Sequence, residues 1–269
     1  MNPFLSTYDI KEFTGLTTIL CIEEGSSVLC AIPGSYQFTV PTCNDLFVAK
    51  VQSLSFPDTS KIICYDKGEL LNASKVFWAL KAAGFEDIFI LLGGVYLYHD
   101  LGFNVTNDPI PEVPMVESNY LPFNNSVFKI TSEEMKNKSS YCQKIRADVE
   151  LKVSTPRGKL IEVSEIKGML SGEGIKWKCG KAVQVCGRYA PVVAAVLLAL
   201  GEKSVSILVD QKEMNYLSAS KSVAIFNDDL SKAYSVHENS TDFSAGVGSK
   251  KTTKSSRRAG TVCGNCSLF

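Results

Sequence analysis

The chain has 269 residues, of which 45% are hydrophobic and 21% charged, and its 28 basic and 28 acidic side chains give a formal net charge of zero. This composition is typical of a globular protein large enough for two domains, and the lack of a net positive field argues against a nucleic-acid partner. The longest apolar run, 190–200, is far shorter than the roughly 20 residues that span a bilayer, so it predicts a buried helix.

Residues 1–11 lack the basic-then-apolar layout of a targeting peptide, so we expect a cytoplasmic protein. The nine cysteines show no regular spacing and are expected to be reduced thiols. Thiol chemistry is therefore available to this chain, and a disulfide scaffold is not expected.

Residues 1–105 are expected to form a first α/β domain. Its opening part predicts short strands at 17–22 and 27–32, then the turn signal Pro33-Gly34 and a helix at 45–53.

The stretch 61–94 follows the order strand, loop, helix, glycine, strand. An apolar strand at 62–65 runs into Asp66, an amphipathic helix covers 73–83, and another apolar strand follows at 88–92. A strand that returns parallel to its neighbour needs such a crossover helix. The stretch therefore predicts two neighbouring parallel strands.

Four prolines punctuate residues 106–129, which we interpret as a linker between domains. A second α/β domain is expected over 130–235. The pattern Thr131-Ser132-Glu133-Glu134 resembles a capping box that opens a helix toward Lys138.

Residues 182–209 repeat the pattern of the first domain. A short apolar strand leads into Cys186, Pro191 marks the start of an apolar helix, and another strand follows Gly201. When the two copies are aligned, Asp66 falls where Cys186 falls.

This pattern places Cys186 on a strand-to-helix turn. The free N–H groups at the start of a helix favour a thiolate or a bound anion, and Arg188 adds a positive charge. Cysteine is also common at strand ends as a small buried hydrophobe. The repeat favours the functional interpretation without excluding the inert one.

Three phrases in the first half resemble the first domain of tandem rhodaneses: Ile-Ile-Cys-Tyr-Asp-Lys-Gly at 62–68, Val-Phe-Trp at 76–78 and Ile-Leu-Leu-Gly-Gly-Val-Tyr at 90–96. In the second half, 164–168 and Cys186-Gly187 resemble the approach to the active-site loop of thiosulfate and mercaptopyruvate sulfurtransferases. The resemblance implies an α/β protein with two rhodanese-like domains, each a mainly parallel sheet flanked by helices.

The resemblance also implies roles for single residues. The first domain would be non-catalytic, with Asp66 at the cysteine position, and Cys186 would be the catalytic residue of the second. Substrate would be bound by the loop Gly187, Arg188, Tyr189 and Ala190, in which the arginine matches a basic position that thiosulfate-type enzymes use on the donor.

Two residues depart from the family pattern. Tyr189 is bulky in a turn that must wrap an anion, and Pro191 lacks the N–H of one cradle donor. The substrate arginine expected within 146–159 cannot be placed from the sequence.

Two functions therefore compete. A sulfurtransferase would take sulfane sulfur from a small donor such as thiosulfate onto Cys186 as a persulfide and pass it to a thiophilic acceptor, without metal or organic cofactor. Alternatively, the chain is a catalytically inactive rhodanese-fold binding or structural module within a larger assembly. Phosphatase chemistry is excluded, because the residue six positions after Cys186 is Val192 and not arginine.

Residues 236–269 form a basic tail rich in Ser and Gly, with too few apolar groups to build a core. Cys266-Ser267-Leu268-Phe269 fits a prenylation pattern, and Cys263 is a candidate second acylation site. The tail thus predicts either lipid attachment, which would make the protein peripheral on a membrane, or a peptide that binds a protein partner. A zinc site at the two cysteines is poorly supported, since no second pair is nearby.

Overall fold

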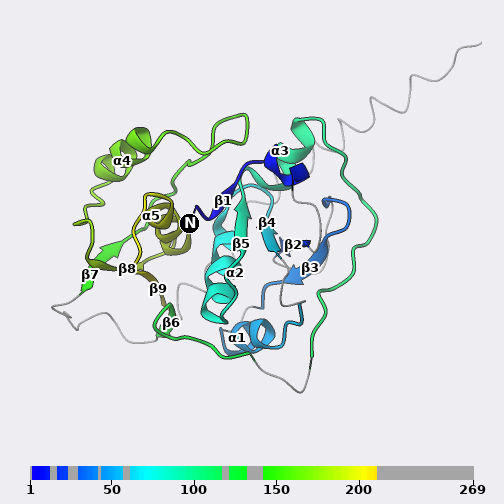
Figure 1. The fold of residues 1–269 in the computed structure, drawn as a ribbon, viewed down its shortest axis with the longest axis horizontal. Helices are drawn as coiled ribbons and strands as arrows, with labels where there is room; N and C mark the ends of the chain where they lie inside the picture. Colours follow the sequence, from blue (N-terminus) through cyan, green and yellow to red (C-terminus); the bar gives the residue numbers. More distant parts are fainter. Residues whose placement is uncertain are drawn as a thin grey trace, which may run out of the picture. The chain divides into compact units, whose positions relative to one another are not determined.

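The computed structural model describes residues 2–12, 17–23, 30–41, 44–56, 61–116, 121–131 and 142–210. These residues belong to one compact unit, Met1–Ser220. The strands are β1 (Phe4–Leu5), β2 (Thr17–Glu23), β3 (Tyr36–Thr39), β4 (Lys61–Tyr65), β5 (Ile88–Leu91), β6 (Phe128–Thr131), β7 (Cys142–Arg146), β8 (Ala182–Cys186) and β9 (Val205–Asp210). The helices are α1 (Asn44–Gln52), α2 (Leu71–Ala82), α3 (Gly94–Asp100), α4 (Val163–Gly172) and α5 (Ala190–Ala199), with a short 3-10 helix at Asp9–Glu12 (Figure 1).

The strands form two parallel sheets. The first has the order β1-β5-β4-β2-β3 and the second the order β6-β9-β8-β7, and every neighbouring pair is parallel. The repeat seen in the sequence corresponds to β4–α2–β5 and β8–α5–β9, at equivalent places in the two sheets. The predicted fold class, two mainly parallel sheets flanked by helices, is confirmed.

Strand β4 shows why these strands are apolar along their whole length. Ile62 and Cys64 belong to the hydrophobic cluster that contains α2, whereas Ile63 and Tyr65 belong to a second cluster with Val95 of α3. Both faces of the first sheet are therefore covered, as expected for a parallel sheet.

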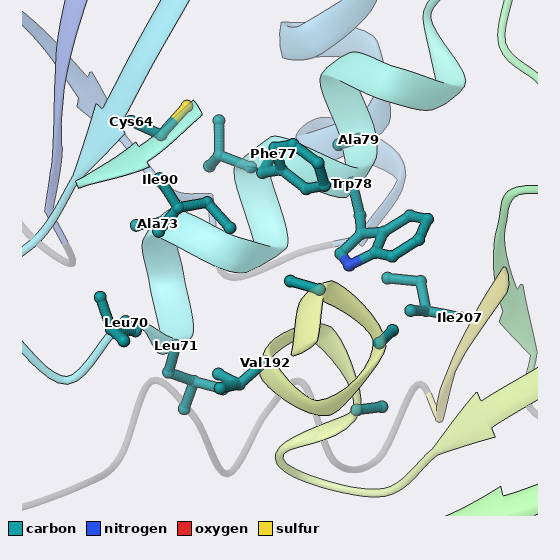
Figure 2. Packing of buried hydrophobic residues seen from close by; sticks show 14 of the residues in the cluster. Cys64, Leu70, Leu71, Ala73, Phe77, Trp78, Ala79, Ile90, Val192 and Ile207 are labelled. Atoms are coloured by element: carbon teal, nitrogen blue, oxygen red, sulfur yellow. The ribbon is translucent and has the colours of Figure 1, made fainter. Parts of the chain in front are cut away.

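Helices α2 and α5 join the two sheets into one hydrophobic core. Helix α5 is apolar on all sides, and its residues from Ala190 to Leu197 are buried, as expected for a helix without a polar face. The indole N–H of Trp78 in α2 donates a hydrogen bond to the carbonyl oxygen of Pro191, at 3.0 Å. Figure 2 shows Leu71 and Trp78 on the side of α2 that faces α5, with Val192 beside Leu71.

The first part of the proline-rich stretch is held against the first sheet. The backbone N–H of Gln37 in β3 donates to Pro111 O at 2.7 Å, and Val113 N–H donates back to Gln37 O at 3.0 Å. Thr106 forms an antiparallel bridge with Ala31. Residues 106–113 therefore cover the β3 edge as a strap, and the domain boundaries near 105 and 130 stay a prediction.

Several predicted features lie outside the described residues. They include residues 27–29 of the strand predicted at 27–32, of which Ala31 forms only an isolated bridge, and the capping-box residues after Thr131, which itself ends β6. The tail with Cys263 and Cys266 also lies there, so its lipidation stays a prediction. Among the described helices, none has the length and apolarity needed to cross a membrane.

Candidate functional site

Cys186 ends β8, opposite Arg146 of β7, and α5 begins four residues later at Ala190. Its side chain is buried, with 5% of its surface exposed, and its Sγ donates a hydrogen bond to Ile145 O at 3.1 Å. Donation to a carbonyl oxygen requires the thiol proton, and the same oxygen would repel a thiolate. This geometry therefore favours the protonated thiol.

Two backbone donors at the end of the loop after Cys186 are used within the protein. Tyr189 N–H donates to Ala147 O at 2.8 Å, and Ala190 N–H donates to Gly187 O at 3.0 Å. Pro191, in the first turn of α5, has no N–H. Three consecutive positions that would line an anion cradle thus offer no donor to a ligand.

The equivalent loop of the first sheet does form such a cradle, and Asp66 fills it. Asp66 Oδ1 accepts hydrogen bonds from Gly68 N–H at 2.9 Å and Leu70 N–H at 3.1 Å, while Oδ2 accepts from Ala73 N–H at 3.2 Å. Burial raises the pKa of this carboxyl, and the backbone donors partly offset that effect.

Backbone geometry shapes this first loop. Four residues, 67–70, separate Asp66 from α2, against three between Cys186 and α5. Leu70 caps α2 with a φ of 62°, a left-handed conformation that costs a bulky residue roughly 1 kcal/mol. In this conformation Leu70 N–H donates to the Asp66 carboxylate.

Gly93 and Gly94 allow the first loop to pack closely on the start of α3. A Cβ atom at Gly94 would lie 2.6 Å from Gly68 N, and closer still to Asp66 O. Gly94 is therefore required by the closed cradle around Asp66, whereas a Cβ atom at Gly93 would meet the side chain of Leu97.

Carboxylates flank the Cys186 loop. A Cβ atom at Gly187 would lie 2.6 Å from Asp148 Oδ1, so this carboxylate is against the loop, where Arg146 Nε donates to its other oxygen. Arg188 lies over the Tyr189 ring, 5.5 Å from its centroid. Asp148 is thus paired with Arg146, which lies opposite Cys186, and Arg188 is the arginine of the loop itself.

The two loops are close to each other. Burial is the main cause that raises the pKa of Glu69, in the first loop, followed by the charges of Asp66 and Glu150, whereas the charge of Arg188 lowers it. The structure thus brings Arg188 of the predicted site close enough to the first-sheet loop for its charge to act on Glu69. Sequence reasoning missed Asp148 and Glu69, although Asp148 follows a strand end closely and could have been considered.

The residues described by the structure contain no group of three or more His, Cys, Asp or Glu side chains that could hold a metal ion.

No protein-family model matches this sequence, and no curated protein sequence matches it. Solved structures do. SseA from Escherichia coli, a 3-mercaptopyruvate sulfotransferase described with the rhodanese fold, matches with a TM-score of 0.58 at 19% identity, over 77% of this chain and 98% of its own. The chain has the fold of the tandem rhodaneses.

Two further rhodanese-fold matches are larger proteins. A persulfide form of an EanB variant with ergothioneine matches with a TM-score of 0.59 at 13% identity, over 77% of this chain and 66% of its own. YnjE matches with a TM-score of 0.57 at 15% identity, over 77% of this chain and 64% of its own. This chain therefore spans less than two thirds of EanB and YnjE, and at these identities the likeness concerns the fold alone.

Proposed function

We propose that this chain uses the rhodanese fold as a non-catalytic binding or structural module within a larger assembly. The hydrogen bond from Cys186 Sγ to Ile145 O carries this proposal, because it engages the buried thiol with the backbone of β7. The internally used donors at Tyr189 and Ala190 and the missing N–H of Pro191 agree with it.

The carboxylates that interact with the arginines near the loop also support a non-catalytic role. A sulfurtransferase of the thiosulfate type must stabilise a dianionic donor and then a persulfide anion. Here Asp148 lies against Gly187, and Glu69 is close enough to Arg188 for the two charges to interact. The positive charge that a donor would need is therefore partly neutralised.

Sulfur transfer through Cys186 is the second candidate. It is favoured by the position of this thiol at a strand end directly before α5, with Arg188 two residues on, and by the likeness to EanB, solved with a cysteine persulfide. In this reaction a Cys186 thiolate would attack the outer sulfur of thiosulfate and release sulfite. Cyanide or a thiol would then take the sulfur from the persulfide and restore the thiolate.

The two candidates are separated by assaying thiosulfate:cyanide sulfurtransferase activity of the purified protein beside Cys186→Ser. We expect thiocyanate formation at the level of a protein-free blank in both. Cys179→Ser, which removes an exposed thiol, is the matched control. Turnover that is lost in Cys186→Ser and kept in Cys179→Ser would establish sulfur transfer.

A further inference from the structure

The zero net charge of the chain is the sum of an acidic first part and a basic second part. Residues 1–120 carry 6 Lys and Arg against 14 Asp and Glu, whereas residues 121–210 carry 14 against 9. Positive charge is therefore concentrated on the part of the chain that contains the second sheet. Such a separation favours binding of the basic part to an anionic partner.

A fixed loop in this part presents several of the lysines. Glu202, in the turn between α5 and β9, accepts hydrogen bonds from Trp177 Nε1 at 2.9 Å and from Gly180 N–H at 3.2 Å. Together with a bond from the Cys179 thiol, these lower the pKa of Glu202, and the Trp177 bond has the largest effect. The ionised carboxylate thus holds the loop 176–181 in place.

Two further hydrogen bonds attach the same loop to β7. Gln143 Nε2 donates to Lys178 O at 2.9 Å, and Lys178 N–H donates to Gln143 Oε1 at 2.6 Å. The loop is therefore held at two points, and its side chains are presented from a defined backbone.

The loop and its surroundings form what we call the lysine patch. Lys176, Lys178, Lys181 and Lys203 are exposed and lie within or beside the segments that Glu202 joins. Lys167 of α4 is close enough for its charge to lower the pKa of Glu202. The half-buried Trp177 lies among them, with its indole N–H turned to Glu202. The patch consists of Lys167, Lys176, Lys178, Lys181 and Lys203.

We propose that the lysine patch docks this protein peripherally on an anionic lipid surface, a role that goes beyond the proposed module function and does not depend on Cys186. The positively charged groups of the patch are all ammonium groups, which act as point charges, and none is an arginine with the planar fork that grips one phosphate or carboxylate. Juxtamembrane lysines are attracted to anionic headgroups, and tryptophan is favoured at the membrane–water boundary.

A nucleic acid would also attract positive charge, but the patch lacks arginines for base edges, and Trp177 is half-buried and packs against the hydrophobic core.

Sedimentation of the full chain with vesicles tests the proposal. Vesicles of phosphatidylcholine with 30% phosphatidylserine are compared with pure phosphatidylcholine vesicles, at about 50 mM and about 300 mM salt, where screening differs strongly. The patch variant carries Lys176→Gln, Lys178→Gln, Lys181→Gln and Lys203→Gln. The matched control removes four exposed charges elsewhere, with Lys129→Gln, Lys152→Gln, Arg157→Gln and Lys159→Gln. Circular dichroism and thermal unfolding check that both variants fold.

We expect the wild type to bind only the phosphatidylserine vesicles and to release at high salt. Each basic residue near such a surface contributes roughly fivefold in partitioning, so the patch variant should bind at least about tenfold more weakly. The control should retain binding within about threefold. The proposal would be overturned if the wild type did not bind phosphatidylserine vesicles, or if both variants lost vesicle binding equally. So would retention of vesicle binding in the patch variant, or patch-dependent binding of a 20-nucleotide RNA in place of vesicles.

Discussion

The indole N–H of Trp78 and the carbonyl oxygen of Pro191 lie 3.0 Å apart, in a hydrogen bond between α2 and α5 that is shielded from water. These residues are 113 positions apart in the chain, and each follows the loop of its own sheet. The bond therefore joins the two halves of the repeat where their helices pack. It also fixes the start of α5, directly after the Cys186 loop.

The first prediction concerns this contact. Trp78→Phe removes the hydrogen bond and leaves a void in a fully buried position, so the free energy of unfolding should fall by about 2–4 kcal/mol. Urea denaturation followed by circular dichroism measures the change. A loss below about 0.5 kcal/mol would show that α2 and α5 do not depend on this side chain.

The second prediction concerns Asp66 and pH. Burial raises the pKa of this carboxyl in the folded protein above its value in the unfolded chain, about 3.9. The folded state thus holds the proton more tightly, and this group's contribution to stability falls as pH rises from about 4 through the folded-state pKa. Asp66→Asn lacks a titrating group at this position.

Urea unfolding of the wild type and Asp66→Asn at half-unit steps from pH 4 to 8 checks this expectation. The difference in free energy of unfolding, wild type minus variant, should decrease toward higher pH and then become constant. A difference that increases with pH would mean that the backbone donors outweigh burial and that the pKa is lowered.

The third prediction concerns the glycine pair beside the Asp66 cradle. Gly94→Ala should be much more destabilising than Gly102→Ala, although both glycines have a positive φ, 58° and 80°. A Cβ atom at Gly94 meets the backbone of Asp66 and Gly68, whereas a Cβ atom at Gly102 meets nothing within 4 Å. Backbone strain alone costs about 1 kcal/mol, and the clash should add at least about 2 kcal/mol at Gly94.

Thermal or urea unfolding of the two alanine variants measures this difference directly. Equal destabilisation would indicate that the loop around Asp66 can move away from α3 at little cost. It would also remove the closed cradle as the reason for a glycine at position 94.

The fourth prediction concerns the reactivity of Cys186. From the sequence, the loop amides and Arg188 suggest an acidic thiol, whereas the hydrogen bond to Ile145 O predicts a protonated and shielded one. We expect iodoacetamide at pH 7.5 to label the exposed Cys179 first and the buried Cys186 and Cys64 much later. Burial also raises the pKa of Cys64, which makes it an internal reference for an inert thiol.

Peptide mapping by mass spectrometry at timed intervals reads the order of labelling. Alkylation of Cys186 ahead of Cys179 would contradict the non-catalytic role and favour the sulfurtransferase.

Local sequence determined the repeated elements of this protein. Apolar runs bounded by Gly84 and Gly201 predict β4–α2–β5 and β8–α5–β9 because strand length, helix periodicity and glycine stops depend on neighbouring residues. The start of α2 was predicted less accurately, since the helix begins at Leu71, two residues before the predicted start. Its cap, Leu70, adopts a positive φ that no local preference of leucine would suggest.

The character of the site was decided by tertiary structure. The sequence places Cys186 on a strand-to-helix turn, but the partner of its thiol is Ile145, which is 41 residues away and comes from the adjacent strand. The carboxylate of Asp148 against Gly187 and the bond of Trp78 to Pro191 likewise join distant segments. Such contacts depend on the order of strands in the sheets and on how two helices pack, and neither is encoded in a short stretch of residues. The sequence therefore identifies the loop, while the packing of β7 and α2 around it determines what its thiol can do.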